Sequence, residues 1–117
     1  MSVRRTRLTG IGAFATLFRE GVRRDGRWLQ LIATPAQRAT GRVGYVIGRK
    51  ALPSAVARNR VRRVLREVVR RDRAQAVRYD LILRLKCGCE RDEVASVAAE
   101  AEALLATLER AADSDTQ

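Results

Sequence analysis

RNRVRRVLREVVRR, the stretch from Arg58 to Arg71, has the apolar spacing of an amphipathic helix. Successive residues of an α-helix are rotated by about 100°, and on that projection five apolar residues form one continuous arc. The five are Val61, Val64, Leu65, Val68 and Val69. Ser54 is an expected N-cap, so a helix is predicted from about Ala55 to Arg73, with its apolar side packed on a sheet.

The other side of this predicted helix carries positive charge and no acid. Its members, which we call the arginine face, are Asn59, Arg62, Arg63, Arg66 and Arg70. Like charges on one face repel each other by roughly 0.3 kcal/mol per pair, and phosphates of a structured RNA would relieve that repulsion. The Asn59 amide both donates and accepts, which suits a base edge or a 2′-OH. Glu67, at the edge, is expected to pair with Arg63 or Arg71.

Around this helix the sequence predicts three strands and two further helices. Val, Ile and Tyr between Arg42 and Arg49 predict a strand that leads into the basic helix. Further strands are expected over residues 27–34 and 79–85, and residues 22–26 are expected to be a turn or the entry to a strand. The remaining helices are predicted over residues 10–20, capped by Thr9, and from Asp92 to about Arg110. The order is α-β-β-α-β-α, an α+β fold with helices on one side of a small mixed sheet.

The length of 117 residues suits one domain. We expect a basic flexible tail over residues 1–8, a single RNA-binding domain over 9–110 and a disordered tail over 111–117.

Net charge points to a polyanionic partner. The chain has 24 Lys and Arg residues against 13 Asp and Glu, a formal net charge of +11. Residues 41–73 hold eleven basic and two acidic residues, whereas the segment from 74 to the end is net acidic. A single positively charged binding surface explains this division better than charge spread evenly for solubility does. Nearly all the cations are arginine, which suits phosphate and base contacts, although a GC-rich genome would produce the same bias.

Several function classes are disfavoured by composition. The chain has no histidine, which excludes Ser-His-Asp and Cys-His catalytic arrangements, and no catalytic residue is expected in the protein. Cys87 and Cys89 are too few for a structural zinc site, so no metal ligand is expected; reduced thiols in a cytoplasmic protein are the simpler interpretation. No apolar run is long enough to span a membrane, and no secretory signal follows the basic N-terminus.

Three aromatic residues have two possible roles. Phe14, Phe18 and Trp28 can stack on unpaired bases, yet the i,i+4 spacing of the two phenylalanines also fits a buried helix face. Arg49 and Lys50 stand just before the basic helix and extend its positive surface.

The run Leu52-x-x-Ala55-x-x-Arg58-Asn59-Arg60-Val61-Arg62-Arg63-x-Leu65-Arg66 resembles the signature of the bacterial ribonuclease P protein component. The likeness covers about residues 4–110 and includes the helix with Phe14 and Phe18 and the segment Gly44 to Lys50. It implies a subunit of an endoribonuclease whose RNA carries the chemistry with Mg²⁺, removing the 5′ leader of precursor tRNA. It also implies a left-handed βαβ crossover and one protein per ribonuclease P RNA.

The same resemblance assigns roles to individual residues. The leader would lie in a cleft between the sheet and the first helix, lined by Phe14, Phe18 and Trp28. The ribonuclease P RNA would be bound by Arg49, Lys50, Arg58, Asn59, Arg60, Arg62, Arg63, Arg66 and Arg70. Two alternatives remain at this stage: a ribosomal or ribosome-assembly RNA-binding protein, and a DNA-binding regulator that uses the basic helix in a major groove.

Overall fold

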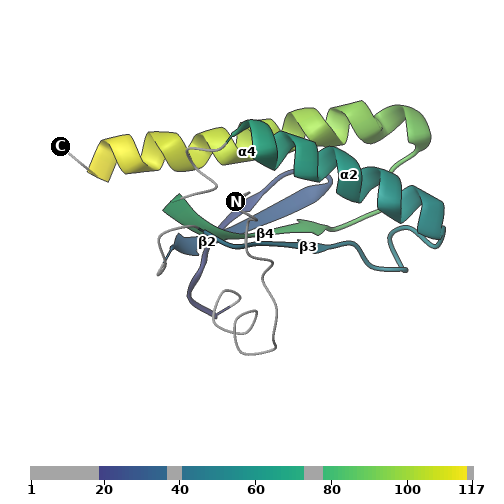
Figure 1. The fold of residues 1–117 in the computed structure, drawn as a ribbon, viewed down its shortest axis with the longest axis horizontal. Helices are drawn as coiled ribbons and strands as arrows, with labels where there is room; N and C mark the ends of the chain where they lie inside the picture. The colour runs from purple at the N-terminus through teal and green to yellow at the C-terminus, as the bar shows by residue number, and fades with distance from the viewer. Residues whose placement is uncertain (1–18, 37–40, 73–77, 116–117) are drawn as a thin grey trace, which may run out of the picture.

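A four-stranded sheet carries two long helices on one of its faces in the computed structural model of the chain (Figure 1). The structure describes residues 19–36, 41–72 and 78–115, with side chains described up to residue 108. The predicted helix over residues 10–20 lies almost wholly outside the described residues, and so do Phe14 and Phe18.

The described elements follow one another as three strands, a helix, a strand and a final helix. Their bounds are β1 Val22–Asp25, β2 Leu29–Pro35, β3 Val43–Val46, α2 Ala55–Arg71, β4 Tyr79–Leu85, the 3-10 helix η1 Arg91–Glu93 and α4 Val94–Asp115. The strands lie in the order β1-β2-β4-β3. β2 is antiparallel to β1 and β4, whereas β3 is parallel to β4, so α2 forms the crossover between two parallel neighbours. The α+β class and the mixed sheet are confirmed; the hand of the crossover stays a prediction.

The sheet has one strand more than the sequence predicted, because residues 22–25 form β1. Its sequence, VRRD, contains a single apolar residue, so no alternation signals a strand. The strand forms because the chain turns back tightly after it, with the Gly26 N–H donating to the Leu29 carbonyl at 2.7 Å. Asp25 then lies opposite Gln30 and Val22 opposite Ala33.

Alternation along the strands separates the two faces of the sheet. Leu31 of β2 lies opposite Leu83 of β4, and both are fully buried on the side of the helices. The apolar arc of α2 packs on this face, as predicted, and so does the inner side of α4. The neighbouring positions, among them Gln30, Ile32, Asp80 and Ile82, belong to the opposite face.

The ends of the helices test the capping predictions. Ser54 caps α2 as predicted, since its Oγ accepts a hydrogen bond from the Ala57 N–H at 3.2 Å. Asp92 was expected to cap the last helix, and this prediction is wrong. The helical turn begins earlier, at Glu90, whose N–H donates to the Glu93 carboxylate at 2.7 Å. At its other end α4 is helical to Asp115, beyond the expected boundary near Arg110.

A nearly buried ion pair fastens the chain before β3 to β4. The Arg42 N–H donates to Asp80 Oδ1 at 2.8 Å, and the Arg42 guanidinium bonds Oδ2 at 3.1 Å. The Asp80 side chain is only 7% exposed. Asp80→Ala would leave the guanidinium largely buried without its counter-charge, so we expect the free energy of unfolding to fall by about 3 kcal/mol. Urea titration measures this loss.

Glu102→Ala is the matched control, because Glu102 pairs with Arg71 at 3.6 Å while both side chains are more than half exposed. Its loss should cost about 0.5 kcal/mol or less. Equal losses in the free energy of unfolding would show that the Arg42–Asp80 pair stabilises the fold no more than an exposed ion pair does.

Candidate nucleic-acid interface

Helix α2 has one buried side and one exposed side. Val61, Leu65, Val68 and Val69 are at most 1% exposed and pack on the sheet. Val64, the fifth residue of the predicted arc, is half-buried at its edge. Burying this stripe fixes the rotation of the helix, so core packing presents the arginine face outward.

The arginine face is accessible along its length. Asn59, Arg63, Arg66 and Arg70 are exposed, and Arg62 is half-buried. The Arg62 guanidinium donates to Asn59 Oδ1 at 3.0 Å, which leaves the Asn59 amide nitrogen to act as a donor. In the described part of the chain, no carboxylate lies within ion-pair distance of Arg60, Arg62, Arg63 or Arg66.

Arg58 has a structural contact that sequence reasoning missed. Its Nη1 donates to the carbonyl oxygens of Leu52 and Pro53 at 2.8 and 2.9 Å. These bonds hold the loop before α2 against the first turn of the helix. The same loop is closed by the Leu52 N–H, which donates to the Gly48 carbonyl at 3.1 Å. Arg49 and Lys50 are exposed within this loop, which precedes the arginine face; their role in RNA binding stays a prediction.

The last turn of α2 differs electrostatically from the first three. Glu67 pairs with Arg70, not with Arg63 or Arg71 as predicted. This hydrogen bond lowers the pKa of the Glu67 carboxyl and raises the pKa of Arg70. Arg71 instead reaches α4 and pairs with Glu102. Arg70 and Arg71 are therefore each offset by one carboxylate, and the positive charge of α2 that has no acidic partner among the described residues is concentrated between Arg58 and Arg66.

Trp28 lies just before β2 and is half-buried against the core on the side of the helices. The Arg27 guanidinium stands over its ring, 4.7 Å from the centroid. The predicted cleft between the sheet and the first helix lies outside the described residues, so the placement of Trp28 relative to Phe14 and Phe18 stays a prediction.

Among the described residues, the remaining titratable groups form no further site. Cys87 is exposed and Cys89 half-buried, and both are free thiols; burial, with a smaller contribution from Glu93, raises the pKa of Cys89. Among residues 19–36, 41–72 and 78–108, no group of three or more acidic, His or Cys side chains could hold a metal ion. The described helices include none that is long and apolar enough to cross a membrane.

The fold and the family are shown by comparison with known proteins. Two solved structures share the fold: the RNase P protein of Staphylococcus aureus, with a TM-score of 0.68 and 16% identity over 93% of this chain and 96% of that one, and that of Thermotoga maritima, with 0.64 and 21% over 90% and 94%. At such identities the likeness speaks for the fold alone.

Sequence relatives carry the assignment further. The ribonuclease P protein component of Chromobacterium violaceum is 31% identical over 104 residues, which cover 89% of this chain and 86% of that protein. The component from a Synechococcus species is 46% identical over 68 residues, about half the length of each chain. The family model for ribonuclease P matches residues 3–109. The ribosomal and DNA-binding alternatives find no support in these matches, and the chain belongs to the ribonuclease P protein component family.

Proposed function

We propose that this chain is the protein subunit of ribonuclease P, bound to the ribonuclease P RNA in a one-to-one complex in the cytoplasm. The observation that carries the proposal is the run of uncompensated cations on the first three turns of α2. Arg62, Arg63 and Arg66 of the arginine face have no acidic partner in the described chain, and the buried side of α2 holds them on one exposed face. Such a face binds a phosphate backbone by releasing its counterions.

The protein's contribution to the reaction is electrostatic and positional. Mg²⁺, bound mainly by the RNA subunit, would activate the attacking water and stabilise the leaving oxygen. The protein's positive charge offsets repulsion between the phosphates of the enzyme RNA and those of the precursor tRNA, so that assembly and substrate binding need less Mg²⁺. No side chain of this protein is proposed to contact the reacting atoms.

A second part of the proposal concerns the 5′ leader of the precursor tRNA. Phe14 and Phe18, with the face of the sheet that bears Gln30 and Arg84, would hold the unpaired leader. Arg84 is exposed on that face, where a phosphate could reach it. Mature tRNA has no leader and loses this binding, so the protein favours substrate over product.

The decisive experiment is cleavage of a leader-bearing precursor tRNA by a bacterial ribonuclease P RNA at low Mg²⁺, with and without the protein. We expect correct 5′ cleavage only when both subunits are present, and none by the protein alone. Affinities of the holoenzyme for precursor and for mature tRNA, measured together, test the leader contact. Tight RNA binding without stimulated cleavage would contradict the proposal and favour a role in ribosome assembly.

A further inference from the structure

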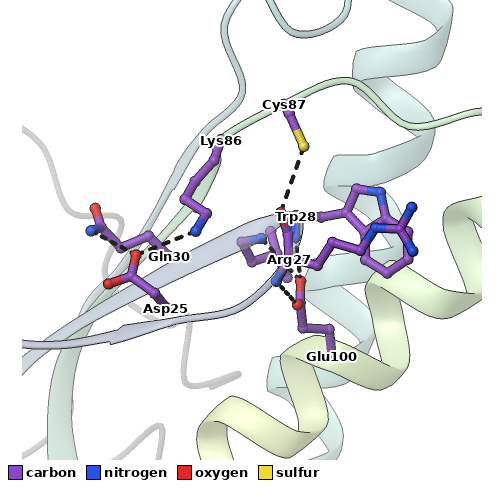
Figure 2. A network of polar contacts seen from close by, with 8 residues as sticks. Asp25, Arg27, Trp28, Gln30, Lys86, Cys87 and Glu100 are labelled. Carbon is purple, nitrogen blue, oxygen red and sulfur yellow. Dashed lines mark hydrogen bonds and ion pairs between the residues drawn. The ribbon is translucent and has the colours of Figure 1, made fainter.

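The turn between β1 and β2 is held by one carboxylate from α4 (Figure 2). Glu100 Oε2 accepts the Trp28 and Leu29 N–H groups at 2.9 and 3.0 Å, and Oε1 accepts the Arg27 N–H. Three consecutive amides thus converge on a single side chain from a distant part of the sequence. A carboxylate bound by several backbone amides forms strong, charge-assisted hydrogen bonds, so the turn is fixed relative to α4.

Gly26 makes this arrangement possible. A Cβ at position 26 would lie 2.1 Å from Glu100 Oε1 and 2.3 Å from Cδ, far inside contact distance. The carboxylate would have to move away and release the amides. Gly26 and Glu100 therefore together fix the position of Arg27 and Trp28.

The fixed turn holds the Arg27 guanidinium in a defined plane over the Trp28 ring. Trp28 is packed on the core, and the exposed Arg27 side chain lies over its ring at 4.7 Å. Within the described residues, no carboxylate is within ion-pair distance of the Arg27 guanidinium, because Glu100 is bound to backbone amides. Stacking restricts the guanidinium, so less side-chain entropy is lost when its planar fork binds an anion.

The turn lies at the same end of the fold as the loop before α2. The Lys86 N–H donates to the Trp28 carbonyl at 2.7 Å, and Cys87 Sγ lies 3.6 Å from the Arg27 carbonyl. The next residue, Gly88, approaches the other loop so closely that a Cβ there would lie 2.7 Å from the Ala51 carbonyl oxygen. The segment from Lys86 to Gly88 therefore bridges the β1–β2 turn and the loop that carries Arg49 and Lys50.

We propose that Arg27, stacked on Trp28 and positioned by Glu100, is a second phosphate contact for the same RNA that binds the arginine face. The inference rests on the proposed function. It gives Trp28 a role different from the one expected from the family resemblance: the ring supports Arg27 and is covered by it, instead of stacking on the leader. The ligand is the phosphate backbone of the folded ribonuclease P RNA.

Arg27→Ala should weaken binding to a bacterial ribonuclease P RNA by about fivefold to tenfold at moderate salt, and should reduce the salt slope of the binding constant by about one. Arg27→Lys keeps the charge without the planar fork, so it should restore the slope but only part of the affinity. Thermal unfolding of both variants should match that of the parent protein, because Arg27 is exposed.

The matched control is Arg78→Ala. Arg78 is exposed and precedes β4, at the opposite end of the sheet from the β1–β2 turn, as the pairing of Tyr79 with Pro35 and of Leu85 with Leu29 shows. Arg78→Ala removes one positive charge, as Arg27→Ala does. An equal loss of affinity in Arg78→Ala would overturn the proposal, because the effect would then be one of net charge.

Trp28 is the only tryptophan in the chain, so intrinsic fluorescence reports on this turn alone. We expect its emission to change, and its quenching by acrylamide to fall, when ribonuclease P RNA is added. Adding precursor tRNA to the assembled complex should cause no further change beyond that seen with mature tRNA. A change that requires the leader would overturn the proposal and return Trp28 to the leader cleft.

Glu100→Gln tests the positioning role, since the amide keeps only one acceptor oxygen. Affinity should fall while the salt slope stays the same, because the Arg27 charge remains, and acrylamide should reach Trp28 more readily in the free protein. Unchanged affinity and quenching would remove Glu100 from the proposal.

In the same titration, loss of binding in an Arg62→Ala, Arg66→Ala double variant but not in Arg27→Ala would refute the second contact alone. No loss of binding in either variant would refute the proposed function.

Discussion

Replacing Arg62 and Arg66 together by alanine is expected to weaken assembly with the ribonuclease P RNA by about 100-fold at moderate salt and to reduce the salt slope by about two. Both lie on the arginine face, one turn apart, and neither has an acidic partner in the described chain. All of their charge is therefore available for phosphates. Filter binding over a range of salt concentrations measures both quantities.

Stability should not fall in this double variant. Arg66 is exposed, and the half-buried Arg62 is bound, among the described residues, only to Asn59 on the same helix. Alanine has the highest helix propensity, and removing two like charges from one face relieves repulsion. We therefore expect an unchanged or slightly higher free energy of unfolding, which separates loss of binding from loss of folding.

Arg70→Ala with Arg71→Ala is the matched control on the same helix. It removes two charges as well, but Arg70 is paired with Glu67 and Arg71 with Glu102. The charge lost is partly compensated in the free protein, so the loss of affinity should be clearly smaller, about tenfold or less. If the two double variants behave alike, the binding surface is the whole helix and the distinction between its first turns and its last turn is wrong.

Local patterns explain which parts of the fold were predictable. The amphipathic arc of α2, its cap at Ser54 and the bounds of β4 at Tyr79 and Leu85 all follow from spacing or residue type within a few positions. β1 has no such signal, since it is specified by the turn at Gly26 and by its pairing with β2. The start of the last helix was misplaced because several acids between Glu90 and Glu93 are all capable caps, and only geometry selects among them.

Several features of the site depend on tertiary contacts and could not be predicted from sequence patterns. The arginine face needed only the helical period. By contrast, side-chain rotamers decide that Glu67 pairs with Arg70 and not with Arg63 or Arg71. The Arg71–Glu102 pair depends on the packing of α2 against α4. Glu100 has no local signal at all, because its partners are backbone amides about seventy residues away in the chain. None of these three contacts could be predicted from the order of residues.

The buried side of α2 predicts the opposite outcome from that of the arginine face. Leu65 is fully buried in the core that the sheet forms with α2 and α4. Leu65→Ala removes its contacts and leaves a cavity, so we expect the free energy of unfolding to fall by about 3–4 kcal/mol. Val56→Ala is the matched control, because Val56 is 68% exposed on the same helix. Its truncation should change stability by about 0.5 kcal/mol or less.

Excess RNA should add the same stability to Leu65→Ala as to the parent protein, so the deficit caused by the cavity should persist in the complex. The variant keeps every residue of the arginine face, so its folded fraction binds the RNA normally, and excess RNA stabilises the folded state by mass action. We therefore expect urea unfolding to show a large deficit in the free protein, while the salt slope of RNA binding equals that of the parent. A reduced slope in Leu65→Ala would mean that the packing of α2 does not simply orient the cations but alters which of them reach the RNA.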